Sequence, residues 1–216
     1  MNIINKFLNK GQYIEEVTVK NKIVLHHTVS SSFSSAFNWW NQTSDRVGTH
    51  FIIDKDGTIY YVVPEDYWIY HIGKGSTSND NKQSFGIELV NEGPLKLESN
   101  SSFSWLDGKA KYNGEVYQHS WRGYMYWASY TKNQIHSLID LLRYLTDKYN
   151  INKEIATSFL YNRDYFNFLG IVSHHNLRSD KTDVSPALNL SWLNKIINNE
   201  IQIDSKPIES IKKTEE

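Results

Sequence analysis

The chain has 216 residues, which is enough for one domain with a full hydrophobic core. Its 23 basic and 24 acidic residues leave a net charge of −1, so we expect no nucleic-acid partner, which would need a strongly basic surface. The sequence has no cysteine, which excludes disulfides and thiolate zinc sites and leaves histidine and carboxylate as metal ligands.

The N-terminal segment contains only isolated apolar residues, and no apolar run approaches the ~20 residues that a membrane span needs. We therefore expect synthesis in the cytoplasm, without a secretory signal and without insertion into a membrane. The sequence pattern divides the chain into three parts. We expect a leader at residues 1–20 that packs on the domain, with a short strand near 13–19, then the main domain at 21–200 and a charged, flexible tail at 201–216.

An apolar run at residues 22–28 predicts a buried strand that ends in the adjacent His26 and His27. Because successive side chains of a strand point to opposite faces, one histidine can face a pocket while the other packs elsewhere. A short helix is expected around residues 36–40, with nearby serines as N-cap candidates. Residues 50–63 then predict a β-hairpin whose turn ends in Asp-Gly.

Residues 85–90 predict another strand, which is apolar except for Glu88. A buried carboxylate costs several kcal/mol unless it is paired, protonated or at a cavity, so Glu88 either lies at a cavity or faces solvent from an edge strand. Residues 91–130 are irregular and rich in Trp and Tyr, and we interpret them as a hairpin or long loop that carries an aromatic surface. Its hairpin-turn candidates are Asp-Gly at 107–108 and Asn-Gly at 113–114.

The clearest predicted helix spans residues 131–149, because a Thr-x-x-Gln capping box precedes apolar residues at helical spacing. Residues 169–175 predict a second apolar strand, which ends in another histidine pair. A polar loop follows it, and a last helix is expected at 190–199 with Ser191 as its N-cap.

Two predicted strands thus end in histidines, and a loop with Lys181 and Asp183 follows the second. Two imidazoles and one carboxylate can bind zinc with one position left open, where zinc lowers the pKa of water to ~7 and polarises an amide carbonyl. Amide hydrolysis also needs a proton carrier, and Glu88 is suited to this because burial raises the pKa of a carboxyl. Lys181 faces the same side as Asp183 in an extended segment, and its charge suits a developing oxyanion.

Five motifs occur in order along the chain. They are Ile-Val-Leu-His26-His-Thr, Gly-Thr-His50-Phe-Ile-Ile, Tyr-His71-Ile-Gly, Phe-Gly-Ile-Glu88-Leu, and Ile-Val-Ser-His174 followed by Lys181-Thr-Asp183. Together they resemble the type 2 N-acetylmuramoyl-L-alanine amidases over roughly residues 20–200. That family includes phage lysins and cytosolic muropeptide-recycling amidases, and it shares its fold with the peptidoglycan recognition proteins. The resemblance implies a single α/β domain with a central mixed β-sheet flanked by helices and a zinc groove on one face.

The resemblance also implies roles for individual residues. Its zinc ligands correspond to the first histidine of each pair and to the loop carboxylate, namely His26, His174 and Asp183. Its catalytic acid/base corresponds to Glu88. The lysine two positions before its third ligand corresponds to Lys181, which we expect to be catalytic.

We expect the substrate-binding residues to be His50, His71, Thr49 and Trp68, where the two histidines contact either the substrate or the residues that surround the zinc ligands. Thr49 stands where many relatives carry a catalytic tyrosine, which leaves the buried glutamate as the main proton carrier. The Asp-Pro-Gly sequence that usually includes the third ligand is absent here, so Asp180 stays open as an alternative ligand.

By this resemblance we expect a zinc-dependent N-acetylmuramoyl-L-alanine amidase that cleaves the bond between N-acetylmuramic acid and L-alanine in peptidoglycan. A monomeric phage endolysin, released when the inner membrane is breached, fits a chain without a signal. Two alternatives stay open: a cytosolic muropeptide-recycling amidase, and a peptidoglycan-binding protein without catalysis, although the complete ligand set argues against the latter. The segment at 91–130 is long for the family and is a candidate for setting substrate preference.

Overall fold

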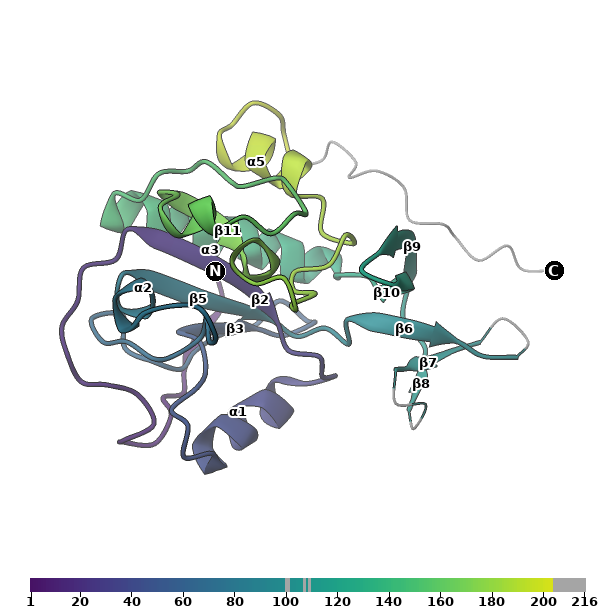
Figure 1. Ribbon diagram of the computed structural model, residues 1–216, viewed down its shortest axis with the longest axis horizontal. Coiled ribbons are helices and arrows are strands. Elements are labelled where there is room, and N and C mark those ends of the chain that lie inside the picture. The colour runs from purple at the N-terminus through teal and green to yellow at the C-terminus, as the bar shows by residue number, and fades with distance from the viewer. Residues whose placement is uncertain (100–101, 107, 109, 204–216) are drawn as a thin grey trace.

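The computed structural model describes residues 1–99, 102–106, 108 and 110–203, and a six-stranded mixed sheet lies at its centre (Figure 1). The strands are β1 (Ile3–Asn5), β2 (Lys22–His27), β3 (Phe51–Ile53), β4 (Ile59–Tyr61), β5 (Ser84–Leu89) and β11 (Gly170–Ser173). Their order is β1-β4-β3-β5-β2-β11. Strands β3, β5, β2 and β11 run parallel, β4 is antiparallel to β3, and β1 is parallel to β4. The predicted central mixed sheet is therefore confirmed.

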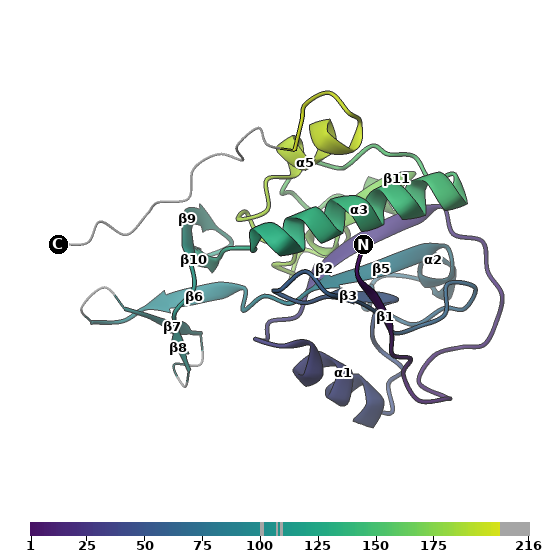
Figure 2. The same cartoon turned by 180° about the vertical axis from the view of Figure 1, so that it is seen from behind.

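Helices lie on both sides of this sheet, as Figures 1 and 2 show from opposite directions. They are α1 (Phe33–Gln42), α2 (Ser78–Lys82), α3 (Lys132–Tyr149), the 3-10 helix η2 (Arg163–Phe166), α4 (His174–Leu177) and α5 (Leu190–Ile197). Apolar side chains of α3 and α5 pack with Leu25, Ile87 and Leu89 in the largest core cluster, whereas α1 packs on the other side with Ile52. Because strand side chains alternate, Glu88 points away from α3.

A second sheet of five antiparallel strands projects beyond one end of the main sheet (Figures 1 and 2). Its strands are β6 (Pro94–Leu97), β7 (Phe103–Trp105), β8 (Lys111–Tyr112), β9 (Val116–Trp121) and β10 (Tyr124–Ala128), in the order β8-β7-β6-β10-β9. The segment at 91–130 was expected to form a hairpin or a long loop, and it instead forms a five-stranded sheet. Asn113 and Gly114 close no hairpin because β8 and β9 lie at opposite edges, and Asp107 lies outside the described residues.

Several local predictions are confirmed, including the capping box of α3 and the β3–β4 hairpin, while others were wrong in position. The N-terminal pairing forms at β1, and Ile14 makes only an isolated bridge. Asn189, not Ser191, caps α5. Strand β11 ends at Ser173, so the second histidine pair opens α4 instead of ending a strand. The tail beyond residue 203 lies outside the described residues. None of the described helices has the length and hydropathy to cross a membrane.

Candidate metal centre

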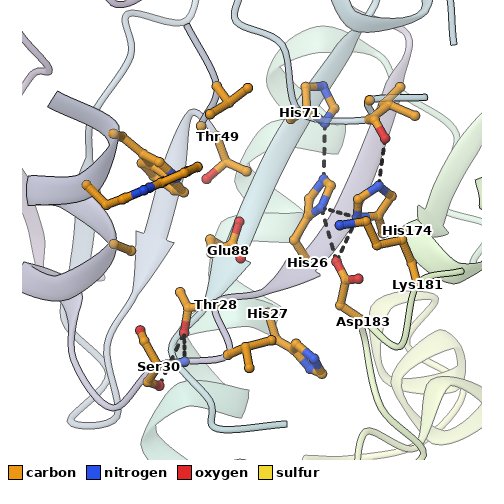
Figure 3. Close-up of a pocket in the computed structure, with 18 of the residues that line it drawn as sticks. His26, His27, Thr28, Ser30, Thr49, His71, Glu88, His174, Lys181 and Asp183 are labelled. Atoms are coloured by element: carbon orange, nitrogen blue, oxygen red, sulfur yellow. Dashed lines mark hydrogen bonds and ion pairs between the residues drawn. The ribbon is translucent and has the colours of Figure 1, made fainter. Parts of the chain in front are cut away.

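Three side chains from distant parts of the chain meet on the face of the main sheet away from α3 (Figure 3). His26 lies near the end of β2, His174 opens α4 directly after β11, and Asp183 lies in the loop that follows. The two histidine Nδ1 atoms are 3.0 Å apart, and Asp183 Oδ2 lies 3.3 Å from the first and 2.8 Å from the second. The structure thus brings the three predicted ligands together in a group that can hold a metal ion.

The His174 ring is oriented by a backbone carbonyl. Its Nε2 atom lies 2.8 Å from the carbonyl oxygen of Ile72. A carbonyl only accepts hydrogen bonds, so Nε2 carries the proton and Nδ1 keeps its lone pair. Such a bond to the second ring nitrogen is the usual way in which a protein orients a metal-binding histidine.

The His26 ring is oriented by a chain of hydrogen bonds that begins at Ser84 and passes through His71, whose bond to His26 is drawn in Figure 3. The Ser84 hydroxyl donates to the backbone oxygen of Asp80 at 2.7 Å and accepts from Nε2 of His71, 2.9 Å away. His71 Nδ1 is then left to accept from Nε2 of His26 at 3.1 Å. His26 Nδ1 therefore presents a lone pair to the cluster, just as His174 Nδ1 does.

The charge states of the cluster suit a cation. Burial, with His174 as a second cause, lowers the pKa of His26 to about 4, so its ring is neutral at neutral pH. Burial alone would raise the pKa of Asp183, but its interactions with His174 and His26 hold it well below the usual range. Metal ligands must be deprotonated to bind, and two imidazoles with one carboxylate match a three-ligand zinc site. The residues present therefore fit a zinc ion.

Glu88 lies beside the cluster because β2 and β5 pair with His26 opposite Glu88. It is 8% exposed, and it lines a pocket of about 640 Å³ together with the three clustered residues and Lys181. The pKa of Glu88 is raised well above its usual range, mainly by burial and secondly by the charge of Asp183. A buried carboxyl with a raised pKa beside a candidate metal site is suited to acid–base chemistry.

The predicted substrate-binding residues divide into two groups. Thr49 and His71 line the pocket. His50 is fully buried and bonds through both ring nitrogens to backbone groups, while the Trp68 indole donates to Glu16 and is 4% exposed. Neither of these two lines the pocket. The burial and backbone bonds of His50 fit the supporting role that the sequence left open for it, and the Trp68 side chain packs outside the pocket lining.

The alternative third ligand lies outside the cluster. Asp180 is exposed, and both of its carboxylate oxygens accept hydrogen bonds from Arg178. Sequence reasoning gave no role to Ser84 or to His175, whose backbone N–H donates to the Asp183 carbonyl at 2.8 Å. The sequence marks His175 only as the second member of a histidine pair. It carries no signal for Ser84, because the bond to its histidine partner depends on the tertiary structure.

Comparison with known proteins places this site in a family. A family model described as N-acetylmuramoyl-L-alanine amidase matches residues 17–186. No curated protein sequence matches the chain. The structure of PlyL is 14% identical with a TM-score of 0.56, covering 91% of this chain and 97% of that one.

Two further solved structures are similar. The endolysine N-acetylmuramoyl-L-alanine amidase LysCS from Clostridium intestinale URNW is 22% identical with a TM-score of 0.50, covering 93% of this chain and 97% of that one. The Staphylococcus aureus hydrolase AmiA is 13% identical with a TM-score of 0.59, covering 93% of this chain and 83% of that one. The TM-scores and coverage show a shared fold, and at these low identities the likeness shows the fold alone. Because the family model spans most of the sequence, the chain belongs to the N-acetylmuramoyl-L-alanine amidase family.

Proposed function

We propose that the protein is a zinc-dependent N-acetylmuramoyl-L-alanine amidase, which hydrolyses the amide bond between N-acetylmuramic acid and L-alanine in peptidoglycan. The observation that carries this proposal is the convergence of His26, His174 and Asp183 beside Glu88 in one pocket. Membership of the family supports peptidoglycan as the substrate.

In the proposed mechanism His26, His174 and Asp183 hold zinc, which when bound supplies Lewis-acid polarisation of the scissile carbonyl and acidifies water. Glu88 takes a proton from the attacking water and passes it to the leaving amine nitrogen, a role to which a carboxyl with a raised pKa is suited. Lys181 lines the same pocket and places a positive charge near the carbonyl oxygen, where negative charge develops.

The pocket mouth has surfaces that suit a sugar–peptide substrate. Trp39 of α1 lines the pocket and is 56% exposed, and Tyr70 lines it and is 36% exposed. Exposed aromatic rings beside a few polar groups are suited to bind the apolar faces of sugar rings and peptide side chains. This lining supports a glycan-linked peptide in preference to a free small molecule.

The proposed biological role is that of a monomeric phage endolysin acting on the bacterial cell wall. The description of LysCS as an endolysin supports this role, since the two chains cover nearly all of each other. A recycling amidase would perform the same chemistry on soluble muropeptides in the cytosol, so the substrate form distinguishes the two roles.

Zinc analysis combined with an assay of newly released amino groups tests the proposal. We expect about one zinc per chain, and faster amine release from purified sacculi than from soluble anhydro-muropeptide. Glu88→Gln serves as the control that keeps zinc and loses turnover. Activity on soluble anhydro-muropeptide alone would indicate a muropeptide-recycling amidase instead of an endolysin. Zinc binding without amine release by the wild-type protein would indicate a binding protein, and a chain without zinc would refute the proposal.

A further inference from the structure

The tip of the β9–β10 hairpin reaches the loop that carries the third ligand of the metal centre. Arg122 and Gly123 connect the two strands with φ angles of 50° and 82°, as in a two-residue turn of type I′. This turn belongs to the second sheet, far along the chain from the loop at 175–183. Two adjacent side chains of the hairpin, Trp121 and Arg122, make the contacts.

The Arg122 guanidinium donates to three backbone carbonyls in the segment between the second and third ligands. It reaches the carbonyl of His175 at 3.4 Å, that of Arg178 at 3.5 Å, and that of Ser179. Two of these carbonyls belong to α4 and its C-cap, a position where helices leave carbonyls without intrahelical partners and where a positive charge is favourable. The guanidinium carries five N–H donors in a fixed planar fork, so one side chain can bond to several carbonyls at once with a single preset geometry.

The Trp121 ring packs against the side chain of His175. It meets the His175 ring edge to face at 5.1 Å, while Phe159 stacks on that ring at 5.0 Å. His175 in turn donates its backbone N–H to the Asp183 carbonyl at 2.8 Å, and its Nδ1 lies 3.0 Å from the Val184 carbonyl. The path from the hairpin to the third ligand therefore consists of direct contacts.

We propose that Trp121 and Arg122 are positioning residues, here called the hairpin clamp, which hold the loop of Asp183 in the geometry that binds metal. Asp183 lies in a segment without helix or strand between α4 and α5, so its position depends on contacts from neighbouring elements. Without the clamp, ordering this loop would cost conformational entropy each time the metal binds. The second sheet then serves the metal centre itself, whatever else it does for substrate preference.

The clamp predicts that Arg122→Gly weakens zinc binding by about 10-fold, a size typical of changes to groups that orient metal ligands. Glycine suits the positive φ at this position, so the variant keeps the turn and the hairpin. Arg122→Lys, which retains the charge but loses the fork, should recover only part of the affinity. Zinc affinity is measured by competition with a chromogenic chelator.

Arg143→Ala is the matched control, because the Arg143 side chain also donates to a backbone carbonyl, that of Ile196 at 2.7 Å, but far from the loop. We expect this control to bind zinc as the wild-type protein does. Equal zinc affinity in Arg122→Gly and the wild-type protein, or an equal loss in both variants, would overturn the clamp.

This inference rests on the proposed function only for the identity of the metal, so a second measurement separates the two. In metal-free protein, hydrogen exchange of the amides of His175, Arg178 and Lys181, each bonded within the loop region, should be faster in Arg122→Gly than in the wild type, with α3 unchanged. Unchanged exchange refutes the clamp even if zinc binding is confirmed. Faster exchange supports it even if the wild-type protein binds no zinc.

Discussion

Glu88 is the residue on which turnover depends in the proposed mechanism. Glu88→Gln keeps the size of the side chain and removes its ability to carry a proton. Because general acid–base catalysis contributes about 10²–10⁴-fold, we expect turnover to fall by at least about 100-fold while zinc content stays at the wild-type level. Amine release from sacculi and metal analysis of the same sample measure both quantities. Undiminished turnover would remove Glu88 from the mechanism.

Asp183 and Asp180 are distinguished by their partners. Asp183 shares its Oδ2 atom between two histidines, whereas Asp180 is bonded to Arg178 at the surface. We therefore expect Asp183→Ala to lose zinc and activity together, as His26→Ala and His174→Ala should. Asp180→Ala should keep zinc. Metal analysis after dialysis decides, and the reverse pattern would show that the third ligand has been misassigned.

Ser84 acts on the metal centre through His71, so its replacement tests the hydrogen-bond chain. Ser84→Ala leaves His71 Nε2 without its acceptor and so loosens the orientation of His26. We expect zinc affinity to fall by about 10-fold. Ser137→Ala removes a similar bond, to the carbonyl of Gly57 at 2.6 Å, outside the site and should leave zinc affinity unchanged. A similar zinc affinity in both variants would argue against an orienting role for Ser84.

At the scale of residues, the sequence predicts the groups that perform the chemistry better than the groups that orient them. His26, His174 and Asp183 stand in recognisable motifs next to strands, and the structure brings them within one coordination shell. Ser84 and Arg122 reach the site through contacts that exist only in the folded chain. The role of His50 stayed open between substrate contact and support, because a motif position does not reveal whether a side chain faces a pocket or the interior.

At the scale of elements, local patterns were sufficient wherever one short segment contains the whole signal. Helix α3 was predicted from its capping box and apolar spacing, and β2 and β5 from their apolar runs. The second sheet was not predicted, because its strands are short and pair out of chain order. The Arg122-Gly123 turn also lacks the Asn or Asp that usually marks a hairpin.

The capping box of α3 also joins this helix to the β3–β4 turn. Thr131 accepts from the backbone of Gln134 at 3.1 Å, and its hydroxyl donates to the Lys55 carbonyl at 2.5 Å. We expect Thr131→Ala to lower the free energy of unfolding by about 1 kcal/mol or more, measured by urea denaturation. Ser32→Ala, which removes the exposed cap of α1, should cost less. An equal loss in both variants would show that the bond to the turn contributes nothing.

At the scale of the whole molecule, the fold concentrates neutral histidines in its interior. Burial is the main cause that lowers the pKa of His27 and His175 to about 4 and that of His50 to about 3. In the unfolded chain these side chains titrate near the ordinary value of 6.5. Above pH 6.5 both states are neutral, whereas below it only the unfolded chain takes up protons. The stability of the fold relative to the unfolded chain is therefore fully present above pH 6.5, and it decreases as the pH falls toward the folded-state pKa values of these histidines.

His50 offers the cleanest test, because it does not itself line the metal pocket and it accepts from the Gly86 amide through Nδ1, so protonation would break that bond. His50→Gln can keep one donor and one acceptor without a group that titrates. The quantity compared is the free energy of unfolding of the metal-free wild type minus that of the variant. We expect this difference to be constant near pH 8 and to fall by about 2 kcal/mol between pH 6.5 and pH 5, at ~1.4 kcal/mol per pH unit. Urea denaturation across this range measures it. If the free energies of unfolding of the two proteins changed with pH in the same way, His50 would take up its proton at the same pH in the folded and unfolded states, which would contradict this prediction.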